Sequence, residues 1–168
     1  MKNNFLKREV KNVQDNQIVL FQIDDQEYGV NIDTVEGINH YKDFKIIKIP
    51  NTEGYVEGII NLRGDVIPLY NLRKKFQLAN SEVDIDSEIL VVSSSDIKIG
   101  FIVDTVVDII RLSSEDIQSA SQLFTQINNE YIQGIGKYEG RMIILLNTQK
   151  ILTIQEREII EPLVEVEA

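Results

Sequence analysis

Apolar residues in this chain occur mostly in short runs that are rich in β-branched side chains. The clearest runs cover residues 18–23 (IVLFQI), 66–70 (VIPLY), 89–92 (ILVV), 99–103 (IGFIV) and 142–146 (MIILL). Runs of this length, bounded by turn-forming residues, are typical of buried strands. Long stretches with helical periodicity are scarce. The pattern therefore predicts a mainly β protein.

The same structural unit is written twice along the chain. Residues 55–74 align without gaps on residues 131–150 at an offset of 76, with eight identical positions. Upstream, residues 28–38 align on residues 99–109 at an offset of 71 and share a glycine and the triplet Asp-Thr-Val. The order and register of these blocks indicate two copies of a unit of about sixty residues.

Each copy predicts the same series of elements. Two strands are followed by the Asp-Thr-Val triplet, which fits either one helical turn or a strand corner. A hairpin then turns at Gly64 or Gly140, where glycine permits a positive φ. Asn71 and Asn147 are placed to cap a short helix after each hairpin. Pro68 lacks an amide hydrogen, so its strand is expected to lie at a sheet edge or to carry a bulge at Pro68 itself.

These elements predict the fold class and its boundaries. Four to five short strands and one helical turn per copy fit a small barrel, which avoids exposed sheet edges. We expect two barrels packed side by side in one domain, residues 17–152. The first subdomain covers about 17–80 and the second about 87–152, and strands can cross between them. Residues 1–16 are expected to form a loose tail, and residues 153–168 a short helix and tail.

Charge and composition narrow the classes of partner. The chain has 17 Lys and Arg against 27 Asp and Glu, a net charge of −10, which repels phosphate backbones and anionic lipids. Cysteine is absent, so disulfides and thiol chemistry are excluded. No run of eighteen uncharged apolar residues occurs. We expect a cytoplasmic protein that binds neither nucleic acid nor membranes directly.

The sequence offers little for catalysis. His40 is the only histidine, so a His-based metal site and a Ser-His-Asp triad each have a single candidate, which a solvated loop histidine explains better. The alternating acids of residues 84–88 fit a solvated linker better than a cation loop, because the EF-hand glycine and span are missing. We expect no catalytic residue, no metal and no cofactor. An enzyme with a polar cavity and a nucleic-acid-binding barrel remain the alternatives.

Two surface features draw attention. Arg63 lies beside Gly64 at a hairpin turn, where its guanidinium can bind a carboxylate or a carbonyl group, or simply serve solubility. Leu123 and Phe124 interrupt an otherwise polar stretch. They either fill the interface between the barrels or anchor a partner.

Four segments together resemble the CheW family of chemotaxis coupling proteins. They are residues 28–38 (YGVNIDTVEGI), 56–76 (VEGIINLRGDVIPLYNLRKKF), 99–117 (IGFIVDTVVDIIRLSSEDI) and 131–152 (YIQGIGKYEGRMIILLNTQKIL), and the likeness runs from Ile18 to Leu152. The resemblance implies two five-stranded SH3-like barrels around a shared hydrophobic seam. It also implies a stand-alone adaptor without enzymatic activity. Such proteins link the cytoplasmic hairpin tip of chemoreceptors to the regulatory domain of the histidine kinase CheA.

The resemblance implies binding roles for the residues that match the family's motifs. Receptor-binding roles fall on Val35, Ile38, Gly58, Arg63, Val106 and Ile109. Kinase-binding roles fall on Leu123 and Phe124, although Gln118 stands where relatives can carry arginine. Relatives often have a glutamate at the position of Gly37 that pairs with the arginine. Here the acid is Glu36, one residue earlier, which leaves its pairing with Arg63 open.

Overall fold

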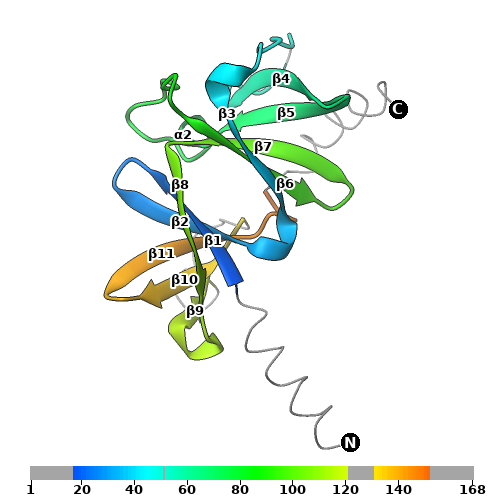
Figure 1. The fold of residues 1–168 in the computed structure, drawn as a ribbon. Helices are drawn as coiled ribbons and strands as arrows, with labels where there is room; N and C mark the ends of the chain where they lie inside the picture. The colour runs from blue at the N-terminus through cyan, green and yellow to red at the C-terminus, as the bar shows by residue number, and fades with distance from the viewer. Residues whose placement is uncertain (1–16, 51, 121–130, 152–168) are drawn as a thin grey trace, which may run out of the picture.

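The structure is a computed structural model that describes residues 17–50, 52–120 and 131–151. These residues form two β sheets with a few single-turn helices, which confirms the mainly β fold (Figure 1). The expected tail at 1–16, the helix at 153–168 and the pair Leu123 and Phe124 lie outside the described residues.

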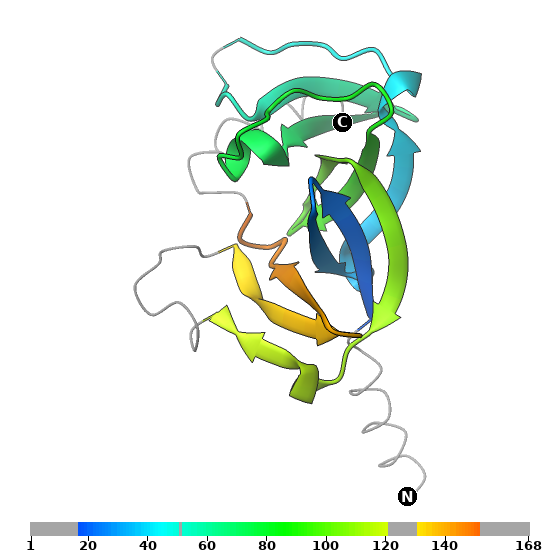
Figure 2. The same ribbon diagram turned by 90° about the vertical axis from the view of Figure 1, so that its left-hand side faces the viewer.

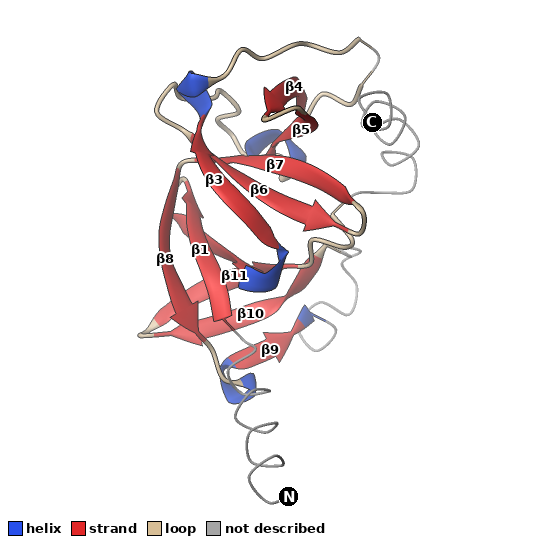
Figure 3. Ribbon diagram, turned by 45° about the vertical axis from the view of Figure 1, so that its right-hand side comes forward, coloured by secondary structure: helices blue, strands red, loops and turns tan. Residues whose placement is uncertain are grey.

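One sheet has six strands and the other has five (Figure 3). In spatial order the six-stranded sheet comprises β8 (Thr105–Arg111), β1 (Gln17–Ile23), β2 (Gln26–Asn31), β11 (Arg141–Leu146), β10 (Ile132–Tyr138) and the short β9 (Ile117–Ser119). The five-stranded sheet comprises β3 (Val35–His40), β6 (Glu88–Ser94), β7 (Ile97–Val103), β5 (Asp65–Asn71) and β4 (Val56–Leu62). The helical turns are η1 (Ile32–Thr34), η2 (Tyr41–Asp43), α2 (Leu72–Lys75) and η3 (Ser114–Asp116).

The two halves of the chain exchange strands. β1 and β2 come from the first copy, yet they lie in the sheet built mainly by the second copy. β6 and β7 make the reverse exchange, so that each sheet contains strands from both copies (Figures 1 and 2). Each exchange is joined by a parallel pairing, β2 with β11 and β5 with β7. The sequence left this crossing open, and the structure shows that it occurs.

Several strands are buried on both faces, which explains their unbroken apolar runs. Alternate side chains of β1 enter two different cores: Ile18 and Leu20 pack inside the six-stranded sheet, whereas Val19, Phe21 and Ile23 pack between the sheets. A third core lies inside the five-stranded sheet and contains Ile60, Ile67, Leu69, Ile89, Val91 and Ile102. We call the cluster between the sheets the central core; it also contains Tyr70, Phe101, Leu146 and Ile151.

The internal repeat is visible in matched contacts. The Asn71 amide donates to the Tyr55 carbonyl over 2.7 Å, and the Asn147 amide donates to the Tyr131 carbonyl over 2.7 Å. Gly29 and Gly100 occupy the same place in the two parallel pairings, opposite Leu145 and Leu69 respectively. These pairs lie at the offsets of 76 and 71 that the sequence alignment predicts.

The copies differ at the Asp-Thr-Val triplet and after the hairpin. In the first copy the triplet forms η1 and the start of β3, whereas in the second it leads directly into β8. Asn71 caps α2 by accepting a hydrogen bond from the Lys74 amide over 3.2 Å. The helix expected after Asn147 is a turn instead, in which the Asn147 carboxamide accepts from the Gln149 amide over 2.9 Å.

The prediction for Pro68 is wrong. Its strand, β5, lies between β4 and β7, and the bulge in the pairing of β4 with β5 falls at Val56 and Gly58. The parallel pairing of β5 with β7 begins only at Leu69. The missing amide hydrogen of Pro68 therefore lies outside that ladder, which explains why an internal strand tolerates the residue.

A partly buried arginine, Arg73, connects the exchanged strands. Arg73 of α2 is 14% exposed and binds both carboxylate oxygens of Asp104, over 2.7 and 2.8 Å. Arg73 also pairs with Asp24 in the turn between β1 and β2. Burial alone lowers the pKa of Arg73, but hydrogen bonds and charges from Asp104 and Asp24 raise it above its ordinary value. The guanidinium thus links the two sheets.

Replacing Arg73 with methionine is expected to lower the free energy of unfolding by about 2 kcal/mol, because the partly buried Asp104 and the exposed Asp24 both lose their partner. Urea unfolding followed by circular dichroism measures this loss. Arg73→Lys keeps the charge but cannot bind both carboxylates in the same way, so an intermediate loss is expected. An unchanged urea midpoint for Arg73→Met would show that the ion pairs do not stabilise the fold.

Candidate functional site

The hairpin between β4 and β5 presents Arg63 at a two-residue turn. Leu62 pairs with Asp65, and the residues between them, Arg63 and Gly64, have φ angles of 53° and 92°. Two successive positive φ values match the type I′ turn, whose twist fits a tight hairpin. Glycine adopts this conformation freely, whereas arginine does so at a cost. The turn leaves Arg63 exposed.

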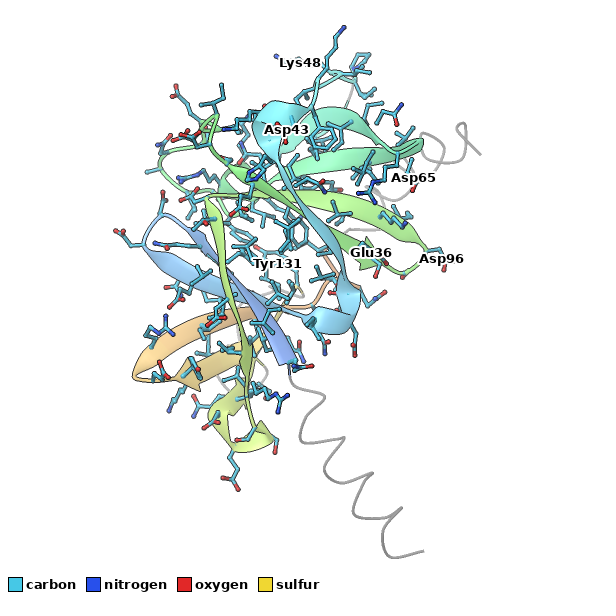
Figure 4. All side chains as sticks on the ribbon, in the orientation of Figure 1. Glu36, Asp43, Lys48, Asp65, Asp96 and Tyr131 are labelled. Carbon is cyan, nitrogen blue, oxygen red and sulfur yellow. The ribbon has the colours of Figure 1, made fainter. Side chains whose placement is uncertain are left out.

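Arg63 lines a hollow of about 250 Å³ on the five-stranded sheet. Its other lining residues come from β3, from the same hairpin and from the two strands between them: Glu36, Gly37, Ile38, Asn39, Leu62, Asp65, Val91 and Lys98. Figure 4 shows Glu36 and Asp65 on the same side of the molecule. The structure therefore brings together Arg63 and Ile38, two of the residues predicted from the sequence. We call this space the arginine hollow.

Sequence reasoning did not identify Val91 and Lys98 as part of this site. Both residues belong to the second copy and reach the hollow only because β6 and β7 have moved into the sheet of the first copy. Neither residue carries a motif that marks it in the sequence. Only knowledge of the strand exchange could have placed them beside Arg63.

The charges in the hollow are incompletely paired. Asp65 and Lys98 form an ion pair at 3.7 Å. Within residues 17–50, 52–120 and 131–151, no carboxylate lies within ion-pairing distance of the Arg63 guanidinium. Glu36 lines the same hollow but forms no ion pair with Arg63, which answers the question that the sequence left open. The guanidinium is thus available to an external acceptor.

The second hairpin repeats this geometry with its charges exchanged. Glu139 and Gly140 have φ angles of 48° and 75°, so Glu139 is the counterpart of Arg63. Arg141 and Glu27 pair at 3.0 Å, at the positions that match Asp65 and Lys98. Arg141 also approaches Glu139 at 3.9 Å. Each copy therefore offers a different charge at the same turn.

The four apolar residues assigned to the receptor groove lie on two edge strands. β3 and β8 form sheet edges on the same side of the molecule (Figures 2 and 3). Ile38 and Ile109 are 48% and 53% exposed, a high value for isoleucine. Val35 and Val106 are half-buried and pack against the central core. Of the four, only Ile38 lines the arginine hollow.

Gly58 has a structural constraint of its own. It is buried at the bulge of β4 with a φ of 151°, and an added Cβ would lie 2.4 Å from the carbonyl oxygen of Ile47. No side chain larger than hydrogen fits there without a shift of the backbone. Gly58 therefore shapes the strand that leads to Arg63.

The remaining polar candidates have simple surroundings. His40 is exposed at the end of β3. Glu88 accepts hydrogen bonds from the Val106 amide over 2.8 Å and from the Thr105 hydroxyl over 2.9 Å, so it supports the start of β8. Asp84 accepts from the Asp86 amide over 2.9 Å. Asp84 therefore stabilises a local turn, whereas Glu88 joins the start of β6 to the start of β8.

A second, apolar hollow of about 200 Å³ lies between the six-stranded sheet and the residues after α2. It is lined by Tyr28, Phe76, Leu78, Tyr131, Ile132, Ile144 and Leu146. Phe76 stacks between Tyr28 and Tyr131, with ring centroids 5.3 and 5.6 Å apart. Burial raises the pKa of both tyrosines, and the charge of Asp24 adds to the effect at Tyr28. This aromatic cluster packs against the central core.

In the part of the chain that the structure describes, no helix is both long and apolar enough to cross a membrane.

Comparison with known proteins assigns the family. Residues 17–156 match the model of the CheW-like domain. The chemotaxis protein CheW of Treponema pallidum is 35% identical over 144 residues, covering 83% of this chain and 84% of the relative. The CheW of Helicobacter pylori is 36% identical over 136 residues, 81% of each chain. The crystal structure of the scaffolding protein CheW from Thermoanaerobacter tengcongensis has a TM-score of 0.75 and 34% identity, covering 85% of this chain and 96% of that one. This chain belongs to the CheW family of chemotaxis scaffolding proteins.

Proposed function

We propose that this protein is a non-enzymatic cytoplasmic adaptor that couples chemoreceptors to the histidine kinase CheA. It binds the cytoplasmic hairpin tip of the receptor at the arginine hollow and along the adjoining edge strands. It binds the regulatory domain of the kinase through a separate surface that includes Leu123 and Phe124. Residues 17–152 act as one domain in this role, without a cofactor.

The observation that carries the proposal is the meeting of Arg63 and Ile38 in one hollow. A guanidinium without an ion-pair partner in the described residues lies beside an isoleucine that is half exposed. Apolar contact supplies affinity, and a charged group fixes register and suppresses wrong partners. A receptor helix fits this site when it presents a carboxylate or a carbonyl group near an apolar side chain.

The other predicted receptor residues have supporting roles. Ile109 on β8 extends the apolar surface to the second sheet, while Val35 and Val106 support β3 and β8 from the central core. Gly58 acts indirectly, because it is buried and sets the course of β4. The receptor therefore meets exposed isoleucines on two strands and one arginine at a hairpin.

Co-sedimentation with receptor-bearing membranes, with and without the kinase, tests the adaptor role. The protein is expected to sediment with these membranes and to bring the kinase with it. Membranes without receptors supply the control, since we expect no direct membrane binding. The proposed function is wrong if the kinase sediments equally in the absence of this protein. It is also wrong if the protein does not sediment with receptor-bearing membranes.

A further inference from the structure

The turn that carries Arg63 is closed by a side chain from β4. The Asn61 carboxamide oxygen accepts a hydrogen bond from the Gly64 backbone amide over 2.8 Å. Asn61 is exposed and pairs with Val66 across the hairpin. This hydrogen bond joins the two sides of the turn, with Arg63 between them in the sequence.

The hydrogen bond bears on Arg63 because this residue adopts a positive φ of 53° inside the turn. The positive-φ region is unfavourable for an L-residue, and a short exposed loop can adopt other turn conformations instead. A side-chain acceptor on the Gly64 amide favours the observed turn over those alternatives. It therefore limits the directions in which the guanidinium can point.

The second hairpin shows that this hydrogen bond is not required for folding. Lys137 occupies the position that matches Asn61, and lysine has no acceptor to offer the Gly140 amide. Nevertheless Glu139 and Gly140 adopt the same turn, with φ angles of 48° and 75°. The acceptor is thus an added feature of the hairpin that carries Arg63.

We infer that Asn61 is a positioning residue: it holds the Arg63 turn in the conformation that binds the receptor, without contacting the receptor itself. The inference rests on the proposed function, since it assigns Asn61 a role only through Arg63. It goes beyond the proposed function because it gives the two residues different roles: Arg63 binds the receptor, and Asn61 orients Arg63.

A double-mutant cycle tests this role. The full-length wild type, Asn61→Ala, Arg63→Ala and the double variant are titrated with a soluble cytoplasmic fragment of a chemoreceptor. Asn61→Ala is expected to weaken binding by roughly two- to tenfold, the range for one lost hydrogen bond, and to leave the melting temperature nearly unchanged. In the Arg63→Ala background the same change is expected to have no further effect.

Two additional variants make the cycle specific. Lys137→Ala, at the matching position of the second hairpin, is expected to bind like the wild type. Asn61→Asp keeps an oxygen acceptor, so hydrogen exchange of its Gly64 amide is expected to be slower than in Asn61→Ala.

The outcomes distinguish a failure of the Asn61 role from a failure of the receptor site at Arg63. If Arg63→Ala weakens binding and Asn61→Ala does not, the positioning role is refuted and the proposed function stands. If Asn61→Ala weakens binding equally with and without Arg63, Asn61 contacts the receptor directly and the inference is wrong. If Arg63→Ala itself binds normally, the receptor site is wrong and the inference falls with it.

Discussion

Gly58→Ala is expected to lower the melting temperature of the protein by about 6 to 15 °C, given a loss of about 2 to 4 kcal/mol. Two penalties add at this position. The new Cβ would lie 2.4 Å from the Ile47 carbonyl oxygen, which already accepts the Ile59 amide over 2.8 Å. In addition, the φ of 151° is one that only glycine adopts readily. The backbone must therefore move or the bulge must be lost.

Differential scanning calorimetry measures the loss, and two further glycines calibrate it. Gly54→Ala adds a Cβ that meets nothing within 4 Å, so an unchanged melting temperature is expected. Gly134→Ala, the counterpart in the second copy, places a Cβ 2.3 Å from the Gln118 carbonyl oxygen and is expected to destabilise as well. If Gly58→Ala melts like the wild type but loses receptor binding, Gly58 would belong to the contact surface itself.

This result also explains why a glycine can appear to be a binding residue. The sequence resemblance placed Gly58 among the receptor residues, yet the side chain that would make a contact is absent and the residue is buried. Its replacement disturbs β4, which leads directly to Arg63. A loss of coupling in a Gly58 variant is therefore expected to accompany a loss of stability.

The repeated pattern of the sequence predicted much of the fold. Hydrophobic runs identified β1, β5, β6, β7 and β11, because strands that are largely buried carry apolar residues at most positions. The gapless alignment of the two copies predicted the matched hairpins and the paired contacts of Asn71 and Asn147. Local rules and internal symmetry were sufficient at these positions.

Long-range pairing was beyond the reach of the sequence pattern. The exchange of β1 and β2 for β6 and β7 depends on which strands meet in three dimensions, and each strand is apolar enough to fit either sheet. For the same reason Pro68 was assigned to an edge or a bulge, and Lys98 and Val91 were not placed at the site. Arg63 and Ile38, by contrast, were found because the family motif carries them.

Arg63→Glu is expected to weaken receptor binding by about a hundredfold, and Arg63→Ala by about tenfold. The alanine variant removes the one guanidinium that the hollow leaves without an ion pair in the described part of the chain. The glutamate variant also places a negative charge beside Glu36 and Asp65, which repels an acidic partner. Both replacements keep an L-residue in the exposed turn, so the fold loses little.

A control with the same change in net charge isolates the site. Lys137→Glu alters the second hairpin by the same two charge units, at an exposed position of β10 two residues before the matching turn. The Lys137→Glu variant is expected to bind the receptor like the wild type. Equal losses of affinity for Lys137→Glu and Arg63→Glu would assign the effect to overall charge.

The affinity of Arg63→Glu for a soluble chemoreceptor fragment, measured by calorimetry beside its melting temperature, tests the central claim most directly. We predict a loss of about a hundredfold in affinity with a melting temperature within about 2 °C of the wild type. Unchanged affinity, or a loss of binding that follows a large fall in melting temperature, would contradict the assignment of Arg63 to receptor recognition.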